Sequence, residues 1–468
     1  MFSKMSKTNK ILIISILFLV ILSSTVFAVY KVFSLGDKKL NFQLILSNEV
    51  TNPTVVNAPK LVDGMIPVKW DNSLGKWVIT TSEDELWYNY DKNVKRWANV
   101  MMSDGAYNSS TAISGTPIDE KDLGSMFVWI PRYEYKITYT NESQIASGGT
   151  ISINFIDSFV IDPTNGYTIH PAFKAGQGTN YENGEWSSEI SGFWMAKFEM
   201  SKETYSSENL AWETEYILDA TKGDITIDNS TTRIVSKPNK EMWTHISIGK
   251  AYSNSKLPTY SLTTTNAEAL NSHMMKNSEW GAVSYLGYSE YGKNSQPNIN
   301  NYMPDKAHLI SGYAGDSPIS TVYQGSPIDE NRYSGQEKGV LASTTGTIYG
   351  VYDMNGGTNE FTAAYFNGGK ALDAASSGNE RYYTVYTAGS METNGKIGDA
   401  TKETYNWDKN AVGDSSGPKN FTSSQYFMRG GGASNGNTVG TSGLFSFFGT
   451  TGDNTSFFRG FRTVLIIE

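Results

Sequence analysis

The hydrophobic positions of the chain form one long N-terminal run and many short runs after it. Residues 11–30 are 20 consecutive uncharged residues, preceded by Lys4, Lys7 and Lys10 and followed by Lys31. That length suits a helix crossing a hydrocarbon core of about 30 Å. The lysines on the N-terminal flank place that end in the cytoplasm. The pattern predicts a single-pass anchor in the cell membrane over residues 11–33, with the C-terminal part outside.

A cleaved signal peptide is the alternative for the same segment. The apolar residues 11–22 are followed by small residues up to Ala28, where a signal peptidase could cut. Cleavage near Ala28 would give a secreted protein. Apolar residues continue past that point, at Val29, Tyr30, Val32 and Phe33, which favours the uncleaved anchor. Both alternatives export the rest of the chain.

Short apolar runs separated by long loops rich in Gly, Ser, Asn and Thr follow. Two stretches have helical spacing, residues 244–255 and 266–291, and Gly281 and Gly287 interrupt the second. Few helices, short strands and long loops predict an irregular α+β domain. The runs that read as strands are residues 126–130, 151–155, 159–161, 193–198 and 462–467.

The pattern divides the chain into segments. We expect the anchor or signal peptide over residues 1–35, a stalk over 36–60, an aromatic-rich β module over 61–105, a linker over 106–123 and a large domain over 124–468. In the module, Trp70-Asp71 precedes Trp77 as Tyr90-Asp91 precedes Trp97, which predicts short antiparallel hairpins with cross-strand aromatic pairs. These aromatic residues either form a glycan-binding shelf or pack as a small core.

Charge and cysteine content exclude several functions. The chain has 38 Lys+Arg against 47 Asp+Glu, a formal charge of −9, which argues against nucleic-acid binding. It has no Cys, so it forms no disulfide, no thiolate nucleophile and no Cys-ligated metal site.

Four sequence blocks resemble the formylglycine-generating-enzyme (sulfatase-modifying factor) family. They are GFWMAKFE at residues 192–199, NSEWGAV at 277–283, GVYDMNGGTNEF at 350–361, and RGG at 429–431 followed by RGFRTVL at 459–465. The resemblance covers residues 124–468 and implies a C-type-lectin-like fold with long loops. The same fold and ending occur in bacterial and phage surface proteins. The segment MFVWIPR at 126–132 also resembles the entry segment of such proteins.

This chain lacks the metal-binding cysteines of the enzymes that it resembles. The enzymes of that family hold copper with two cysteines, and this chain has none, so no copper is expected and we interpret the domain as non-catalytic. One alternative is an oxidase with iron bound by histidines, of which the chain has His170, His245, His273 and His308. Another is a structural component of an envelope or phage particle.

A structural calcium site is the cofactor that the resemblance implies. Its ligands would be the side chains of Asp353 and Glu360 and the carbonyls of Gly356 and Thr358. The alternative is a hairpin turn in which Glu360 forms a salt bridge with an arginine such as Arg462.

The segment between Arg429 and Arg462 is the candidate recognition surface. It interleaves small polar residues with aromatic ones, a composition that combines rigid contact area with adaptable hydrogen bonding. We expect it to bind an extracellular protein or glycan without catalysis. The candidate ligand-binding residues are Ser434, Asn435, Asn437, Thr441, Ser442, Phe445, Phe447, Asn454, Phe457 and Phe458.

Overall fold

The computed structural model describes residues 57–157, 164–176, 186–305, 308–319, 329–366, 372, 380–405, 407, 420–421, 425–433, 442–451 and 455–467. The chain separates into two units, Met1–Val50 and Thr51–Glu468, and all described residues belong to the second. The expected anchor over residues 11–33 therefore lies outside the described residues. Among the helices that are described, none has both the length and the apolar character needed to cross a membrane.

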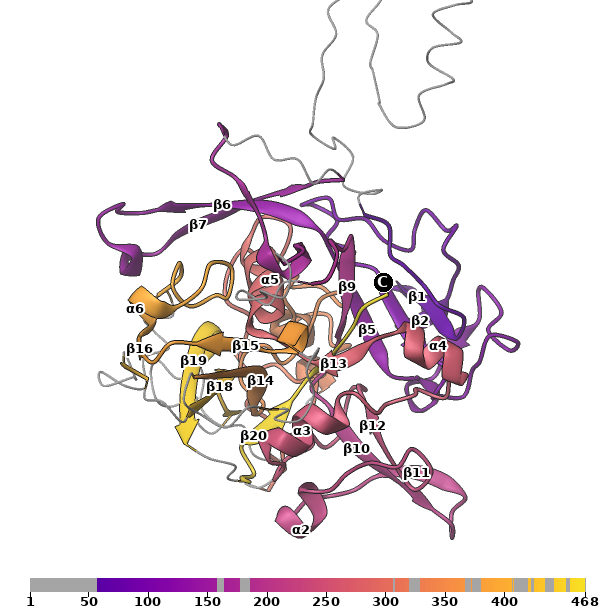
Figure 1. Cartoon of the computed structure of the whole chain (residues 1–468). Helices are drawn as coiled ribbons and strands as arrows, with labels where there is room; N and C mark the ends of the chain where they lie inside the picture. Colours follow the sequence, from indigo (N-terminus) through magenta and orange to yellow (C-terminus); the bar gives the residue numbers. More distant parts are fainter. Residues whose placement is uncertain are drawn as a thin grey trace, which may run out of the picture. The chain divides into compact units, whose positions relative to one another are not determined.

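An eight-stranded sheet joins segments from both ends of the second unit (Figure 1). Every neighbouring pair in it is antiparallel. Its order is β13 (Ser272–Met274), β21 (Thr463–Leu465), β9 (Gly192–Ala196), β5 (Met126–Pro131), β3 (Asn99–Met102), β1 (Met65–Asp71), β2 (Lys76–Ile79) and β4 (Pro117–Ile118).

A second sheet carries the remaining part of the C-terminal sequence. Its order is β15 (Thr384–Tyr386), β14 (Asn359–Phe366), β18 (Gln425–Gly430) and β19 (Gly443–Thr451), and β20 (Arg459–Phe461) also pairs with β14. Strands β18 and β19 form a long antiparallel ladder, whereas β14 pairs in parallel with both β15 and β20. Residues 459–465 thus supply a strand to each of the two sheets.

Three smaller sheets and several short helices complete the described fold. The sheets are β11 (Ala211–Thr214), β10 (Ser201–Ser206) and β12 (Thr232–Val235); β7 (Gly149–Phe155), β6 (Tyr133–Tyr139) and β8 (Thr168–Ile169); and β16 (Gly389–Ser390) with β17 (Asn420–Phe421). The α-helices are α2 (Ala220–Gly223), α3 (Ile248–Asn254), α4 (Thr264–Ala269), α5 (Asn277–Tyr288) and α6 (Met391–Asn394). Single 3₁₀ turns are η2 (Glu120–Asp122), η3 (Ile145–Ser147), η4 (Pro171–Phe173), η5 (Asp329–Asn331), η6 (Gly339–Ala342) and η7 (Glu380–Tyr382).

Most of the predicted elements are present. The strands expected over 126–130, 151–155 and 193–198 are β5, β7 and β9, while the run over 159–161 lies outside the described residues. The helix expected over 244–255 is α3. The stretch over 266–291 is two helices, α4 and α5, with the strand β13 between them. A sheet-rich chain with few helices confirms the coarse α+β prediction.

The expected module over residues 61–105 does not stand apart from the rest. Strands β1 and β3 continue the main sheet next to β5, and β4, inside the expected linker, pairs with β2. The hairpin prediction itself is confirmed, because Trp70 and Trp77 are cross-strand partners with ring centroids 5.6 Å apart. Trp77 and Trp97 are both buried, so they pack as core and do not form an exposed shelf.

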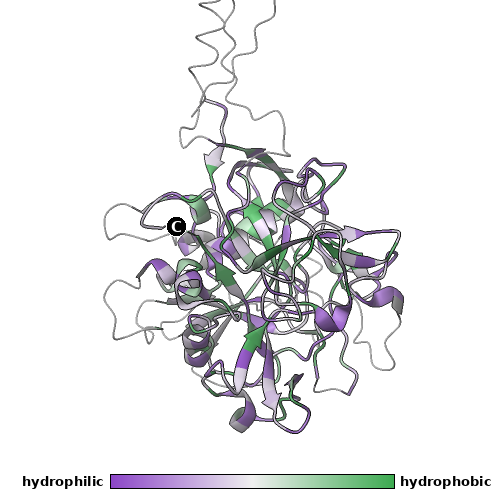
Figure 2. Cartoon of the chain, turned by 90° about the vertical axis from the view of Figure 1, so that its right-hand side faces the viewer, coloured by the Kyte–Doolittle hydropathy of each residue, from purple (hydrophilic) through white to green (hydrophobic). Residues whose placement is uncertain are grey.

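Eight of the 11 tryptophan side chains lie in the interior of the fold. Side chains at Trp77, Trp87, Trp97, Trp129, Trp186, Trp194, Trp243 and Trp280 are all fully buried. Figure 2 shows the hydrophobic stretches on strands in the interior and the hydrophilic stretches on loops and helix surfaces. Each buried indole removes a large apolar area from water, which stabilises short strands that would be marginal alone.

Candidate functional site

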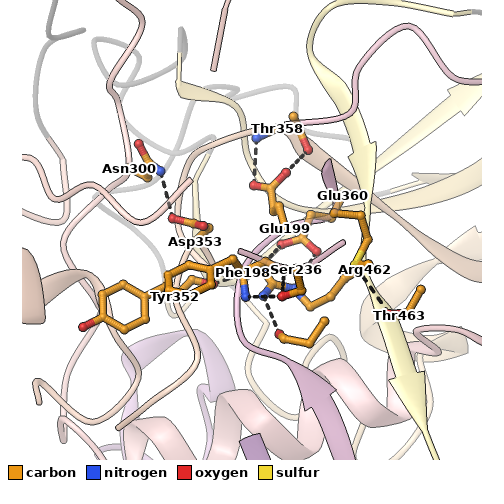
Figure 3. Close-up of polar contacts among 12 residues, drawn as sticks. Phe198, Glu199, Ser236, Asn300, Tyr352, Asp353, Thr358, Glu360, Arg462 and Thr463 are labelled. Carbon is orange, nitrogen blue, oxygen red and sulfur yellow. Dashed lines mark hydrogen bonds and ion pairs between the residues drawn. The ribbon is translucent and has the colours of Figure 1, made fainter. Parts of the chain in front are cut away.

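Three of the four sequence blocks that carry the family resemblance meet at one buried cluster of charged side chains (Figure 3). Glu199 follows β9, Asp353 precedes the turn into β14, Glu360 lies in β14, and Arg462 lies between β20 and β21. All four side chains are buried. We call these four residues the carboxylate cluster.

Arg462 holds one member of the cluster by a bidentate ion pair. Its Nε lies 2.9 Å from Glu360 Oε2 and its Nη2 lies 2.8 Å from Glu360 Oε1. The same guanidinium donates to the carbonyls of Ala196 and Tyr352, both at 2.9 Å. Arg462 therefore ties β9, the 350–361 segment and β14 together at the point where the chain passes between the two sheets. Fork-shaped pairing of this kind is available to arginine and not to lysine.

The other two carboxylates accept hydrogen bonds from backbone and side-chain donors. Glu199 accepts from the backbone N–H of Thr358 at 2.9 Å and from the Thr358 hydroxyl. Asp353 accepts from Asn300 Nδ2 at 2.8 Å and from the Gly312 N–H at 3.0 Å. The φ of Gly357 is +67°, and a side chain at this position would collide with Glu199 Oε1. The turn is thus built around the Glu199 carboxylate.

Burial perturbs the pKa of every carboxyl group in the cluster. It raises the pKa of Glu199 well above its usual value, with the neighbouring charges of Glu360 and Asp353 acting in the same direction. Burial also raises the pKa of Asp353 to about 6, although Arg462 opposes the shift. The pKa of Glu360 is raised for the same reason and is likewise opposed by Arg462. Burial among three acids and one arginine thus disfavours the charged form of the Glu199 carboxyl group.

The geometry bears directly on the predicted calcium ligands. Asp353, Gly356, Thr358 and Glu360 do lie in one turn, as expected, but Glu360 forms the alternative salt bridge with Arg462, and both of its oxygens accept from that guanidinium. Asp353 is directed at Asn300 and Gly312. Across the described ranges there is no group of three or more His, Cys, Asp or Glu side chains arranged to hold a metal ion. The engagement of both Glu360 oxygens favours the salt-bridged turn, the alternative to the calcium site.

The four histidines have different surroundings. His170 is buried among Tyr133, Tyr135, Phe173 and Tyr285, and burial lowers its pKa to about 3. His273 Nε2 lies 2.9 Å from Glu279 Oε1 in a second buried pair. His308 lies against Tyr216, and His245 lies near Phe457. Each histidine thus packs with its own set of neighbours.

A rigid frame supports the strands that border the recognition segment. Arg429, at the end of β18, donates to the carbonyls of Asp399 at 3.1 Å, Ala400 at 2.9 Å and Leu444 at 3.3 Å. Trp280 Nε1 donates to the same Leu444 carbonyl at 2.7 Å. We call this arrangement the Arg429 frame. It fixes the last residues of β18 and the first residues of β19, between which residues 431–442 run.

The structure places only part of the predicted recognition surface. Ser434, Asn435, Asn437, Thr441 and Asn454 lie outside the described residues. Ser442 and Phe445 are buried, and Phe445 packs against Tyr288 and Trp407 with centroid distances of 5.0 and 5.5 Å. Their burial argues against the direct ligand contact that was expected of them.

The other predicted aromatic residues are partly exposed. Phe447 lies in β19, and Phe457 and Phe458 lie just before β20 with ring centroids 3.5 Å apart. Phe447 packs at the edge of the core formed by Ala364, Phe366, Tyr386 and Phe427. Phe457 packs at the edge of a different core cluster, formed by Met242, Met303, Leu309 and Ala433. These three aromatic rings keep surface that a ligand can contact.

Two buried acids were not singled out by sequence reasoning. Glu199 stands within a quoted motif but had no assigned role, because its partner Thr358 is 159 residues away. Glu241 is 5 % exposed, and within the described part of the chain neither carboxylate oxygen has a hydrogen-bond partner. Burial raises the pKa of Glu241 to about 9, and the charge of Asp305 adds to the shift.

No protein-family model matches the chain, and no curated protein matches it significantly. The resemblance to the sulfatase-modifying factor family thus rests on the four sequence blocks alone.

Proposed function

We propose that this chain is an exported, membrane-anchored surface protein whose C-terminal domain binds an extracellular protein or glycan without catalysis. The domain would have the C-type-lectin-like fold implied by the four sequence blocks. The observation that carries the proposal is the Arg429 frame. It holds the two strands that flank a segment rich in small polar and aromatic residues.

The buried charges support a binding role over a catalytic one. Glu360 and Arg462 use their polar atoms on each other and on backbone carbonyls, and Glu199 accepts from Thr358. Groups used in this way stabilise the turn and the two sheets. The absence of any Cys removes the thiolate copper ligands of the resembled enzymes.

Binding would use the aromatic rings as anchors. Phe447, Phe457 and Phe458 are partly exposed. Core clusters hold Phe447 and Phe457 in place, and Phe458 packs on Phe457, so little conformational entropy is lost when a ligand contacts them. Hydroxyl and amide groups of the segment would add hydrogen bonds.

A glycan and protein array probed with the full chain in mild detergent tests the proposal. We expect a defined set of ligands whose binding weakens by about tenfold or more in the double variant Phe457→Ala/Phe458→Ala, since anchoring aromatic residues carry most of the binding energy. Leu74→Ala, which also removes an exposed apolar side chain but lies in the turn after β1, is the matched control. Ligand binding that survives the double variant unchanged would reject this surface.

A further inference from the structure

A cavity of about 390 Å³ lies between the β10–β11–β12 sheet and residues 104–121. The sheet is at the lower right of Figure 1. The residues that matter for its chemistry are Lys121, Glu203, Trp212, Arg233, Lys237 and Lys240. None of them belongs to the carboxylate cluster or to the recognition segment. The volume lies at the lower end of the range for small-molecule sites.

One carboxylate in this cavity is shared by three cations. Glu203 Oε2 lies 2.5 Å from Arg233 Nη2, and Glu203 Oε1 lies 3.5 Å from Lys237 Nζ and 3.8 Å from Lys240 Nζ. Burial alone would raise the pKa of Glu203, but Lys237 and Arg233 together lower it. Glu203 is thus ionised, and one negative charge faces three positive charges.

The other acids of the lining are already engaged. Asp104 accepts from the backbone N–H of Ser125 at 2.6 Å and from its hydroxyl at 2.5 Å. Glu120 pairs with Arg332 at 3.0 Å, outside the lining, and accepts from Asn239. The lining therefore holds four cations, Lys121 included, against three carboxylates, and Glu120 also neutralises an outside arginine. Positive charge is concentrated here in a chain whose net charge is −9.

Arg233 and Lys240 have hydrogen-bond donors that are available to a ligand. Arg233 uses Nε and Nη2 on Glu203, and its Nη1 has no hydrogen-bond partner among the described residues. Lys240 Nζ is too far from Glu203 for a hydrogen bond. Burial lowers the pKa of Lys240; the charges of Glu203 and Glu120 oppose this shift, and repulsion from Lys237 and Arg233 adds to it. A bound anion would relieve this repulsion.

The guanidinium of Arg233 is held in position before any ligand arrives. Its Cζ lies 4.2 Å from the ring centroid of Trp212, and the ring of Tyr205 lies 5.5 Å from Trp212. Stacking on one side and Glu203 at one edge fix the plane of the group. A planar donor fixed in this way is suited to carboxylate or phosphate oxygens.

We propose that this cavity binds the carboxylate or phosphate group of a small polar molecule about the size of a monosaccharide. Arg233 Nη1, Lys240 and Lys121 contact the oxyanion, and Glu203 keeps the cations together when the ligand is absent. The site is separate from the proposed recognition surface, so either proposal can fail alone.

Isothermal titration calorimetry of the full chain at low salt tests the site. The probes are glucuronate, glucose 6-phosphate, inorganic phosphate and neutral glucose. We expect at least one of the two sugar acids to bind, more tightly than inorganic phosphate does, and glucose not to bind. Added salt should weaken binding, because the interaction is electrostatic. Binding of glucose as tight as that of glucuronate, or binding of inorganic phosphate as tight as that of glucose 6-phosphate, would overturn the proposal.

Single lysine variants locate the binding. Lys240→Met and Lys121→Met should each weaken binding by about tenfold, the loss of one charge-assisted contact. Lys136→Met, on β6 and outside the lining, should leave it unchanged. Thermal unfolding of each variant confirms that it is folded; Lys121 is exposed and makes no hydrogen bond within the described chain, so its variant keeps the fold. Equal binding by all three variants would refute the assignment.

Discussion

Replacing Glu241 with Gln should stabilise the protein increasingly as the pH rises. The Glu241 carboxyl group is buried without a hydrogen-bond partner in the described chain, and burial raises its pKa to about 9. The usual value is 4.5. Between these two values the folded state holds a proton that the unfolded state releases. The free energy of unfolding of the wild-type protein therefore falls as the pH rises, while a Gln at this position does not titrate.

The size of the effect follows from the pKa difference. Each pH unit inside the window lowers the free energy of unfolding by about 1.4 kcal/mol. Between about pH 5.5 and about pH 8.5 the wild-type protein should lose about 4 kcal/mol relative to Glu241→Gln. This is an upper limit, because water entering the site would lower the folded-state pKa. The amide of Gln is itself buried, which adds a pH-independent cost of about 1–3 kcal/mol.

Urea unfolding of both proteins across that pH range, followed by circular dichroism, measures the difference. All other titrating groups are shared, so only the change of the difference with pH is informative. Glu85→Gln, at an exposed position, is the matched control. A constant difference between wild type and Glu241→Gln from acid to alkaline pH would refute the reasoning.

Three further predictions concern the buried charges. Arg462→Met should lower the free energy of unfolding by about 3–5 kcal/mol, because it leaves Glu360 buried without its partner; a loss below about 1 kcal/mol in urea unfolding would contradict the pairing. Calcium should leave the unfolding temperature unchanged, since both oxygens of Glu360 accept from Arg462; a rise that disappears in Asp353→Asn would instead establish the calcium site. His170 should stay neutral in the folded protein down to about pH 4, because burial lowers its pKa to about 3. The neutral, buried imidazole contributes fully to the free energy of unfolding above its usual pKa of 6.5, and this contribution declines as the pH falls toward the pKa of the folded state. NMR titration of the imidazole signals measures the pKa, and a titration near pH 6.5 would contradict the burial.

Local sequence patterns predicted local elements well. The runs that became β5, β7 and β9 are rich in aromatic and β-branched residues, and the β1–β2 hairpin follows from the turn residues between Trp70 and Trp77. The interruption between α4 and α5 was expected, but at Gly281 and Gly287. Gly281 instead lies inside α5, where a side chain would collide with the Gly398 carbonyl.

Contacts between residues far apart in the sequence could not be predicted from local patterns. Strand β13 exists because Ser272–Met274 pairs with Thr463–Leu465, some 190 residues later. The same limit applies to the main sheet, which absorbs the expected separate module, and to Glu199 and Thr358. The pairing of Glu360 with Arg462 was foreseen as an alternative, since the two residues belong to motifs that resemble one family. The cavity lining comes from six separate stretches of chain and has no sequence signature.

Strand β21 lies between β13 and β9, inside the sheet and not at its margin. A chain still emerging from a ribosome cannot close this sheet until residues 463–465 are released, so one edge each of β13 and β9 waits unpaired until then. Completion of the sheet therefore depends on residues that lie far along the chain from β5 and β9. Removing residues 463–465 would separate β13 from β9 and so break the sheet between them.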